Sequence, residues 1–309
     1  MDENYKIALF IPTYNAMTEC DGIFTKNLTI IKQANLNEVL IIDSSSIDST
    51  VATINSFGFK VKVISKDKFD HGGTRTEAFK ILSFNNDFII FLTQDTLLLD
   101  TDSLKNLIQP MITDSLIAGV YGKQLPHPDA DLFAMHLRSF NYSNVSYVRS
   151  YSDRFIYGIK CAFSSNSFAA YRTDALKHIN GFSEHLIMGE DMYVFAKFLQ
   201  ANFKVAYEAK AICFHSHNYS IKEEFKRYFD IGVFHRTENW VLRDFGGPDK
   251  YGIKYFISEL RFLGLRFYLW PKLFLKTIAK YVGYKLGYHF DIIGVVLCRK
   301  FSCNTSFWW

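Results

Sequence analysis

The stretch KIALFIPTYN, residues 6–15, carries the pattern that decides the fold. Five consecutive apolar residues follow Lys6, end at Pro12 and give way at once to polar side chains. A continuous apolar run of this length predicts a parallel strand that is buried on both faces. The run EVLII at residues 38–42 repeats the pattern and ends in Asp43 and three serines. We therefore expect two parallel strands whose carboxyl ends carry polar loops.

Outward from these two strands, short apolar runs alternate with segments of helical spacing. Further strands are predicted at residues 60–65, 87–92, 116–122, 204–207 and 211–214, and helices at 22–33, 48–57, 74–83 and 220–243. The alternation is typical of an α/β fold with a Rossmann-like, mostly parallel central sheet and helices on both faces. Ligands of such folds bind outside the carboxyl ends of the strands.

Polar segments follow three of the predicted strands, and a fourth precedes a helix. They are residues 12–15, 43–48, 93–95 and 69–75. Each alone is typical of an ordinary turn, because Asp, Ser, Asn and Gly favour turns and helix caps. Four such segments at one edge of one sheet indicate a binding site.

The composition excludes several classes of protein. With 49% hydrophobic and 21% charged residues, a chain of 309 residues buries a full core and is not globally disordered. The longest stretch without Asp, Glu, Lys or Arg, residues 7–18, is too short to span a bilayer. Five scattered cysteines without a CxxC pair argue against a zinc site or disulfide framework, and we interpret them as packing residues. The acidic start lacks the pattern of a secretory signal, so we expect a cytoplasmic location.

Basic residues gather towards the end of the chain. From Lys250 onward there are ten Lys and Arg against two acids, a net charge of +8 that leaves −4 for the rest. A helix is predicted from Pro271, with an apolar stripe at Leu275, Ile278, Ala279, Val282 and Leu286 beside Lys272, Lys276 and Lys280. A basic face beside an apolar face favours an anionic membrane surface. Packing on the body is the alternative, and nucleic acid is disfavoured because no recognised RNA-binding motif is present.

Three short motifs carry residues able to do chemistry. Asp95 follows a buried strand and suits Mg²⁺ or Mn²⁺, and His215 and His217 could add nitrogen ligands. Arg75 follows two glycines at a helix start, where it could meet a diphosphate. Glu190-Asp191 opens a helix, which is typical either of an N-terminal cap or of a general base with a neighbouring orienting acid. Neither a dinucleotide-binding GxGxxG nor a P-loop is present there.

Six motifs, in their order along the chain, resemble family-2 glycosyltransferases. They are IPTYN at 11–15, IDSSS at 42–46, HGGTR at 71–75, FLTQD at 91–95, GED at 189–191 and HSH at 215–217. The Gly-Gly-Thr-Arg and Thr-Gln-Asp forms are similar to the bacterial rhamnosyltransferases that build O-antigen and other surface polysaccharides. The resemblance covers residues 6–309.

The resemblance implies a GT-A fold, a nucleotide-sugar donor, a divalent cation (Mg²⁺ or Mn²⁺) and inversion at the anomeric carbon. It assigns donor binding to Thr13, Asn15, Asp43, Ser45, Gly73, Arg75 and Gln94. It makes Asp191 the catalytic base, Asp95 and His217 metal ligands, and Asn166, Glu190 and His215 orienting or acceptor residues. Thr93 replaces the first acid of the family's Asp-X-Asp motif.

The resulting hypothesis is an inverting rhamnosyltransferase that uses dTDP-L-rhamnose and a lipid-linked or growing polysaccharide acceptor. We expect a catalytic domain at residues 1–219 and a helical region at 220–309 that attaches the protein to the inner face of the cell membrane. Two alternatives stay open: the same fold using UDP-galactose or UDP-N-acetylglucosamine, and a catalytically silent, membrane-attached binding subunit, which Thr93 motivates.

Overall fold

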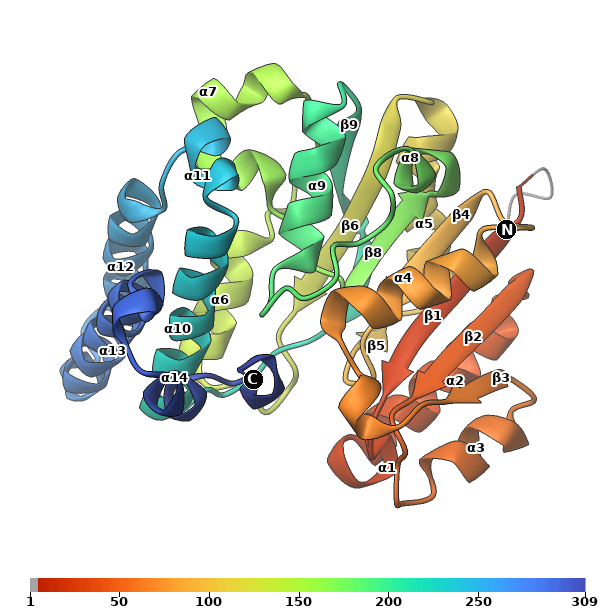
Figure 1. Cartoon of the computed structure of the whole chain (residues 1–309), viewed down its shortest axis with the longest axis horizontal. Coiled ribbons are helices and arrows are strands. Elements are labelled where there is room, and N and C mark those ends of the chain that lie inside the picture. Colours follow the sequence, from red (N-terminus) through yellow and green to blue (C-terminus); the bar gives the residue numbers. More distant parts are fainter. Residues whose placement is uncertain (1–4, 309) are drawn as a thin grey trace.

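The computed structural model describes residues 5–308 and contains one mixed β-sheet with helices packed on both faces (Figure 1). The strands are β1 (Ile7–Thr13), β2 (Glu38–Asp43), β3 (Lys60–Val63), β4 (Phe88–Leu92), β5 (Leu97–Leu98), β6 (Ile117–Leu125), β7 (Tyr147–Arg149), β8 (Phe168–Arg172) and β9 (Lys204–Phe214).

The strand order is β3-β2-β1-β4-β8-β6-β9-β5, and β7 pairs with β9. Strands β3, β2, β1 and β4 run parallel, as predicted, so their carboxyl ends meet at one edge. Strand β8 runs antiparallel between β4 and β6. This insertion carries the polar loop before β8 to the same edge as the ends of β4 and β6.

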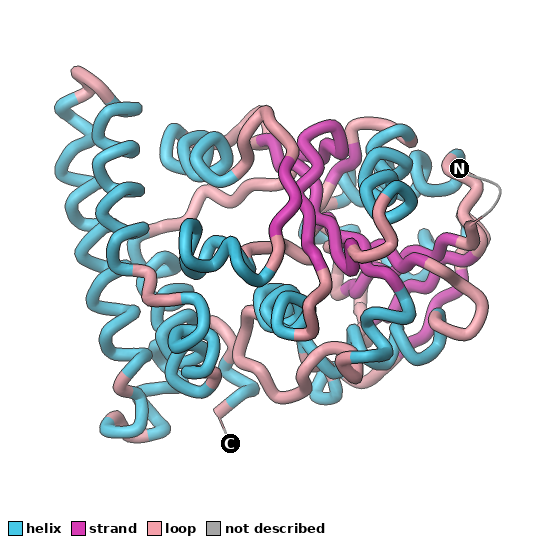
Figure 2. Tube along the Cα trace, turned by 90° about the horizontal axis from the view of Figure 1, so that it is seen from above, coloured by secondary structure: helices cyan, strands magenta, loops and turns pink. Residues whose placement is uncertain are grey.

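Helices cover the sheet on two sides, and the long C-terminal helices stand at one end of it (Figure 2). The α-helices are α1 (Ala16–Glu19), α2 (Asp21–Gln33), α3 (Thr50–Ser56), α4 (His71–Leu82), α5 (Asp102–Thr113), α6 (Leu132–Asn141), α7 (Arg154–Tyr157), α8 (Thr173–His178), α9 (Glu190–Gln200), α10 (Ile221–Thr237), α11 (Asn239–Phe245), α12 (Asp249–Leu263), α13 (Trp270–Tyr288) and α14 (Val295–Phe301).

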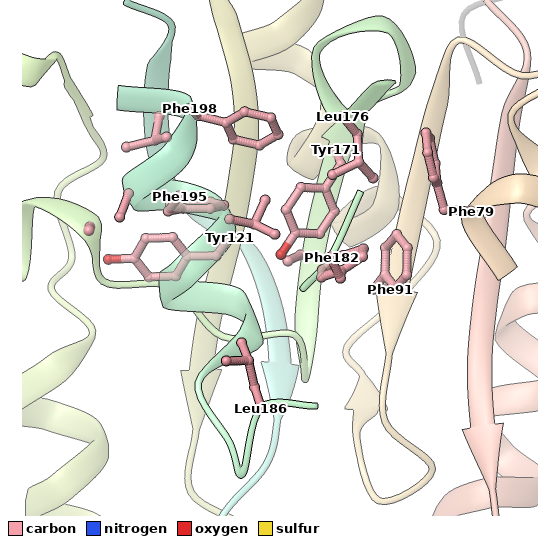
Figure 3. Close-up of a cluster of buried hydrophobic side chains, with 14 of the residues drawn as sticks. Phe79, Phe91, Tyr121, Tyr171, Leu176, Phe182, Leu186, Phe195 and Phe198 are labelled. Carbon is pink, nitrogen blue, oxygen red and sulfur yellow. The ribbon is translucent and has the colours of Figure 1, made fainter. Parts of the chain in front are cut away.

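Two hydrophobic cores lie on opposite faces of the sheet because successive strand residues point to opposite sides. Leu9 of β1 faces the core shared with α2 and α5, whereas Phe10 faces the core shared with α4 and α9. In the second core, Tyr121 and Tyr171 of neighbouring strands meet Phe195 of α9 (Figure 3). Aromatic contacts thus pack α9, the helix that begins at Glu190, against the sheet.

Local chemistry explains where the elements differ from the expected ranges. Helix α4 begins at His71 rather than Thr74, because the Asp70 side chain accepts a hydrogen bond from Gly73 N and caps it. Residues 204–214 form one strand rather than the two predicted. The pairing with β6 shifts from Gly122–Glu208 to Lys123–Ile212, and this irregularity accommodates the polar residues in the middle of β9. The helix predicted at 220–243 is divided into α10 and α11 around Glu238.

Helices α10 and α13 pack with almost no space between their backbones. A Cβ atom at Gly287 would lie 1.9 Å from the Phe229 carbonyl oxygen, and one at Gly283 would lie 2.4 Å from that of Phe225. From the other side, a Cβ at Gly232 would lie 2.3 Å from the Tyr284 carbonyl oxygen. Glycine is therefore required at this contact. Within residues 5–308, no helix combines the length and apolar character needed to cross a membrane.

Candidate active site

Three potential metal ligands converge at the edge of the sheet, beyond the ends of β4 and β9. Asp95 Oδ2 lies 3.3 Å from His215 Nε2 and 3.3 Å from His217 Nε2. The two Nε2 atoms are 3.1 Å apart, and one ligand atom from each residue falls within 4.8 Å of the others. Both histidines follow β9 in a segment without regular secondary structure, and both rings face the same Asp95 oxygen.

Gln124, at the end of β6, orients the His215 ring. Its oxygen Oε1 lies 2.9 Å from His215 Nδ1 and also accepts a hydrogen bond from Arg138. Because a carboxamide oxygen only accepts, Nδ1 carries the proton and the Nε2 lone pair faces Asp95. Burial lowers the pKa of His215, and burial lowers that of His217 to about 4. Both rings are thus neutral near pH 7, the form that ligates metals.

Asp95 stays ionised among these groups. Burial by itself raises its pKa. At the acidic pH where a carboxyl group titrates, both histidines are protonated, and the hydrogen bond and charge of His215, the Thr93 hydroxyl and the charge of His217 together outweigh burial. The pKa of Asp95 is therefore held below its usual range. Thr93 contributes a hydroxyl where the family motif has a carboxylate.

Glu190 and Asp191 begin α9 and are both held by Asn166. The Asn166 backbone N donates to Asp191 Oδ2 at 3.2 Å, and its side-chain Nδ2 donates to Glu190 Oε1 at 3.1 Å. Tyr171, from the aromatic core, donates its hydroxyl to Asn166 Oδ1 and fixes that amide. Gly189 at φ 80° turns the chain into the helix. The core therefore positions both acids through one asparagine.

Arg75 lies inside the protein and pairs with Glu190. Its Nη1 is 3.3 Å from Glu190 Oε1 and donates to the His71 carbonyl oxygen at 2.8 Å. Both side chains are buried, at 5% and 9% exposed. The sequence pattern predicts that Arg75 meets a diphosphate; in this structure its visible partners are a carboxylate and a carbonyl.

The two neighbouring acids have opposite pKa shifts. Burial favours the neutral form of Glu190, but the charges of Arg75 and His71 and the hydrogen bond from Asn166 together outweigh burial and lower its pKa. Burial, followed by the negative charge of Glu190, raises the pKa of Asp191 to about 7. A carboxylate with its pKa near 7 is suited to accept a proton from a hydroxyl at neutral pH.

The residues predicted to bind the donor gather at the ends of β1 and β2. Thr13 Oγ1 donates to Asp43 Oδ2 at 2.8 Å, and Ser46 donates to both carboxylate oxygens of the fully buried Asp43. Asn15 and Ser45 have φ angles of 47° and 60°, a region that non-glycine residues rarely adopt. Asp43 therefore shapes a strained loop, and its contact with a nucleoside stays a prediction.

Gln94 and Gly73 hold their loops through the backbone. The Gln94 amide accepts from Tyr14 N at 2.8 Å and donates to the Tyr14 carbonyl at 3.1 Å, which joins the ends of β1 and β4. Gly73 N donates to the cap residue Asp70, and a Cβ at position 73 would meet that carboxylate at 3.0 Å. Donor contacts of both residues likewise stay predictions.

A chain of hydrogen bonds links the histidine cluster with the Glu190-Asp191 pair. Gln124 contacts His215 on one side and donates from Nε2 to Ser165 Oγ at 2.9 Å on the other. Ser165 precedes Asn166, which holds both acids. Sequence reasoning missed Gln124 and Arg138, because neither lies in a recognisable motif. The buried, polar Gln124 at the end of an apolar strand was the available signal.

Comparison with known proteins identifies the class. A family model described as "Glycosyl transferase family 2" matches residues 8–179. The chain is 46% identical over 307 residues to the O-antigen chain rhamnosyltransferase RfbN of Salmonella typhimurium, covering 98% of this chain and 96% of that protein. It is 42% identical to the O-antigen chain rhamnosyltransferase WbaN of Salmonella anatum, with 97% and 95% covered.

Solved structures show a similar fold. The mannosyltransferase PcManGT from Pyrobaculum calidifontis, solved with GDP-Man and Mn²⁺, matches with a TM-score of 0.56 at 14% identity, over 98% of this chain and 84% of that one. S. aureus TarS 1–349 matches with a TM-score of 0.54 at 16% identity, over 92% and 90%. The fold is that of the GT-A glycosyltransferases, as expected. The chain belongs to glycosyltransferase family 2, whose members use nucleotide-sugar donors.

The raised pKa of Asp191 predicts a pH dependence of stability. Folded Asp191 holds its proton up to about pH 7, whereas the ordinary pKa is 3.8, so the folded state binds more protons between these values. Stability therefore falls as pH rises through this window. Asp191→Asn should remove this contribution. Between pH 5 and pH 8, the variant should therefore lose roughly 1–3 kcal/mol less of its free energy of unfolding than the parent protein does.

Urea unfolding of both proteins at pH 5 and pH 8 measures this difference. Asp174→Asn, whose side chain is 93% exposed on α8, is the matched control and should leave the pH dependence unchanged. An Asp191→Asn protein with the same pH dependence as the parent would mean that Asp191 titrates at its ordinary pKa.

Proposed function

We propose that this protein is an inverting rhamnosyltransferase that transfers L-rhamnose from dTDP-L-rhamnose to a hydroxyl of a lipid-linked or growing polysaccharide. The single observation that carries the proposal is the hydrogen-bonded link between the Asp95 histidine cluster and Asp191. The near full-length similarity to two O-antigen chain rhamnosyltransferases supports the choice of sugar over the uridine-linked alternatives.

The histidine cluster fits a divalent cation. It offers one carboxylate oxygen and two neutral imidazole nitrogens, and this mixed set suits Mn²⁺ better than Mg²⁺. Gln124 supplies the outer hydrogen bond that typically orients a metal-ligating histidine. When bound, such a cation supplies charge stabilisation to a departing diphosphate.

The residues of the chain support a single displacement. The acceptor oxygen forms a bond to the anomeric carbon while its proton passes to the Asp191 carboxylate. The bond from the anomeric carbon to the diphosphate oxygen breaks, and its electron pair leaves with the nucleoside diphosphate. Glu190, held charged by Arg75, keeps the proton affinity of Asp191 high enough for this task. One displacement on the face opposite the leaving group inverts the configuration.

A panel of nucleotide sugars tests the activity. With a lipid-linked oligosaccharide acceptor, we expect turnover with dTDP-L-rhamnose and little with UDP-galactose or UDP-N-acetylglucosamine. Asp191→Asn should bind the donor normally but lose at least ~100-fold in turnover, because base catalysis contributes about 10²–10⁴-fold. The rising limb of kcat/KM should lie near pH 7 in the parent enzyme.

Asp174→Asn, with its exposed side chain, serves as the control for turnover. Near-parental turnover of Asp191→Asn would exclude Asp191 as the base. Turnover with a uridine-linked donor alone would show that the transferred sugar is not L-rhamnose. Absence of turnover with every donor would favour a catalytically silent binding subunit.

Removal of metal tests the histidine cluster. We expect EDTA to weaken donor binding and Mn²⁺ to restore it, whereas Asp95→Asn should bind donor equally weakly in both conditions. Isothermal titration calorimetry measures the two affinities. Asp100→Asn, an exposed carboxylate in the same β4–α5 connection, is the control. Equal donor affinity of the parent protein with EDTA and with Mn²⁺ would remove the metal from the proposal.

We further propose that the α12–α13 face attaches the protein to the cytoplasmic surface of an anionic membrane, where a lipid-linked acceptor resides. Large apolar side chains are exposed on this face: Ile253, Ile257, Phe262, Leu265, Phe267, Tyr268, Phe274, Leu275, Ile278, Tyr281 and Val282. Of the two acids in α12 and α13, Glu259 is buried and Asp249 is exposed at the start of α12, whereas Lys254, Arg261, Lys285 and, in the connection, Arg266 are exposed. An apolar face with an excess of exposed cations complements an anionic bilayer.

The lysines expected beside the apolar stripe do not all face outward, which corrects the sequence-based expectation. Lys276 is 1% exposed and lies 3.6 Å from Glu224 on α10, and Lys280 lies 3.4 Å from the same carboxylate. Lys272 pairs with Asp131. Helix α13 therefore turns Lys276, Lys280 and its glycines towards the body and leaves Leu275 and Ile278 more than half exposed. This inverted arrangement supports a hydrophobic partner for the outer face.

Vesicle sedimentation tests the membrane proposal. At low salt, we expect the protein to sediment with vesicles of phosphatidylglycerol and phosphatidylcholine, and much less with phosphatidylcholine alone. Replacing Leu275 and Ile278 together by Asp should abolish sedimentation. Phe84→Asp, at an apolar residue after α4 that is even more exposed, should leave sedimentation unchanged. Absence of binding to anionic vesicles, or a stable dimer that the double variant disrupts, would show that this face has another partner.

A further inference from the structure

Burial of Arg75 raises the question of which side chain stabilises the leaving diphosphate. The Nη1 atom of Arg75 contacts Glu190 and the His71 carbonyl oxygen, Nε is buried without a partner, and the side chain is 5% exposed. An incoming diphosphate would have to displace a buried carboxylate to reach it. A cation that is open to solvent and lies close to the Asp95 cluster is better placed for this role.

Arg227, on the second turn of α10, has this position. Its guanidinium carbon lies 5.6 Å from the centre of the Tyr219 ring, and that ring is 5.2 Å from the ring of His217. His217 in turn lies 3.3 Å from Asp95. Tyr219 thus lies beside both Arg227 and the histidine cluster.

Arg227 is exposed and has no carboxylate partner among residues 5–308. The nearest acid on its own helix, Glu224, is paired with Lys276 and Lys280. The guanidinium therefore keeps its donors free, and a planar guanidinium matches the oxygens of a phosphate in a bidentate manner. By contrast, Arg236 near the end of the same helix is paired with Asp291.

Electrostatic interactions place Arg227 near both functional groups. Burial, then His215, lowers the pKa of His217, and the positive charge of Arg227 adds to this lowering. Surrounding atoms desolvate the solvent-accessible Arg227, but its interactions with Tyr219, Tyr228, Glu224 and Asp191 together outweigh this desolvation and raise its pKa. Arg227 thus lies within electrostatic reach of the histidine cluster and of Asp191.

We propose that Arg227 binds the diphosphate of the donor and stabilises the charge that develops on it. This inference rests on the proposed function. As the bond from the anomeric carbon to the diphosphate oxygen breaks, the electron pair and the negative charge move onto the diphosphate, which leaves as dTDP. Arg227 faces that charge, whereas Arg75 acts as a positioning residue that holds Glu190 beside Asp191. The contact forms with the phosphates and not with the nucleoside.

Calorimetric titration of the full-length protein with dTDP and with thymidine tests this assignment. Arg227→Ala should weaken dTDP binding roughly 10- to 100-fold, the loss typical of a charge-assisted hydrogen bond, and leave thymidine binding unchanged. Arg227→Lys should recover part of the affinity, because it keeps the charge but not the fork. Arg236→Ala, which removes an arginine of the same helix, should bind both ligands as the parent does.

The outcomes separate this inference from the proposed function. Parental dTDP affinity in a folded Arg227→Ala protein, checked by circular dichroism, would overturn the role of Arg227 and leave the glycosyl transfer intact. Equal weakening of dTDP and thymidine would also overturn it, because the effect would then be structural. If the parent protein binds UDP but not dTDP, the donor assignment fails, and the same variants are compared with UDP and uridine.

Discussion

The buried ion pair between Arg75 and Glu190 is the interaction on which the site depends. Both charges are removed from water, so loss of either partner would leave an uncompensated charge at a typical cost of about 3–5 kcal/mol. Arg75 comes from α4 and Glu190 from α9, so the pair joins two helices that pack on the same face of the sheet. It also helps to keep Glu190 ionised, and this charge adds to burial in raising the pKa of the neighbouring Asp191.

The adjacent carboxyl groups of Glu190 and Asp191 therefore have opposite pKa shifts in the same surroundings. Asn166 donates to both, and its amide is fixed by Tyr171, whose ring belongs to the aromatic core between the sheet and α9. The packing that stabilises the fold is therefore the same packing that orients the proposed base. On the other side, Gln124 connects this assembly to His215 through its hydrogen bonds to His215 and Ser165.

In the C-terminal helices, buried contacts between α10 and α13 determine which residues of α13 are exposed. Glycines at the α10–α13 contact bring the two backbones together, and Glu224 draws Lys276 and Lys280 inward. Leu273 packs into a small core with Phe133 and Leu263, whereas Leu275 and Ile278 remain exposed on the outer side of α13. Helices α10 and α11 also contribute Phe229, Val233 and Phe245 to the core on the sheet, so the division at residue 219 stays a prediction.

The sequence by itself determined the parallel strands, because uninterrupted apolar runs such as residues 7–11 satisfy a sheet covered on both faces. It also determined the family, because short motifs in a fixed order can be recognised from the sequence without knowing which residues are in contact. Only the tertiary structure decided that Arg75 is buried, that Gln124 orients His215 and that Lys276 points inward. Each of these depends on a partner distant in sequence, and hydrophobic periodicity records which face of an element is buried but not which polar group it meets there.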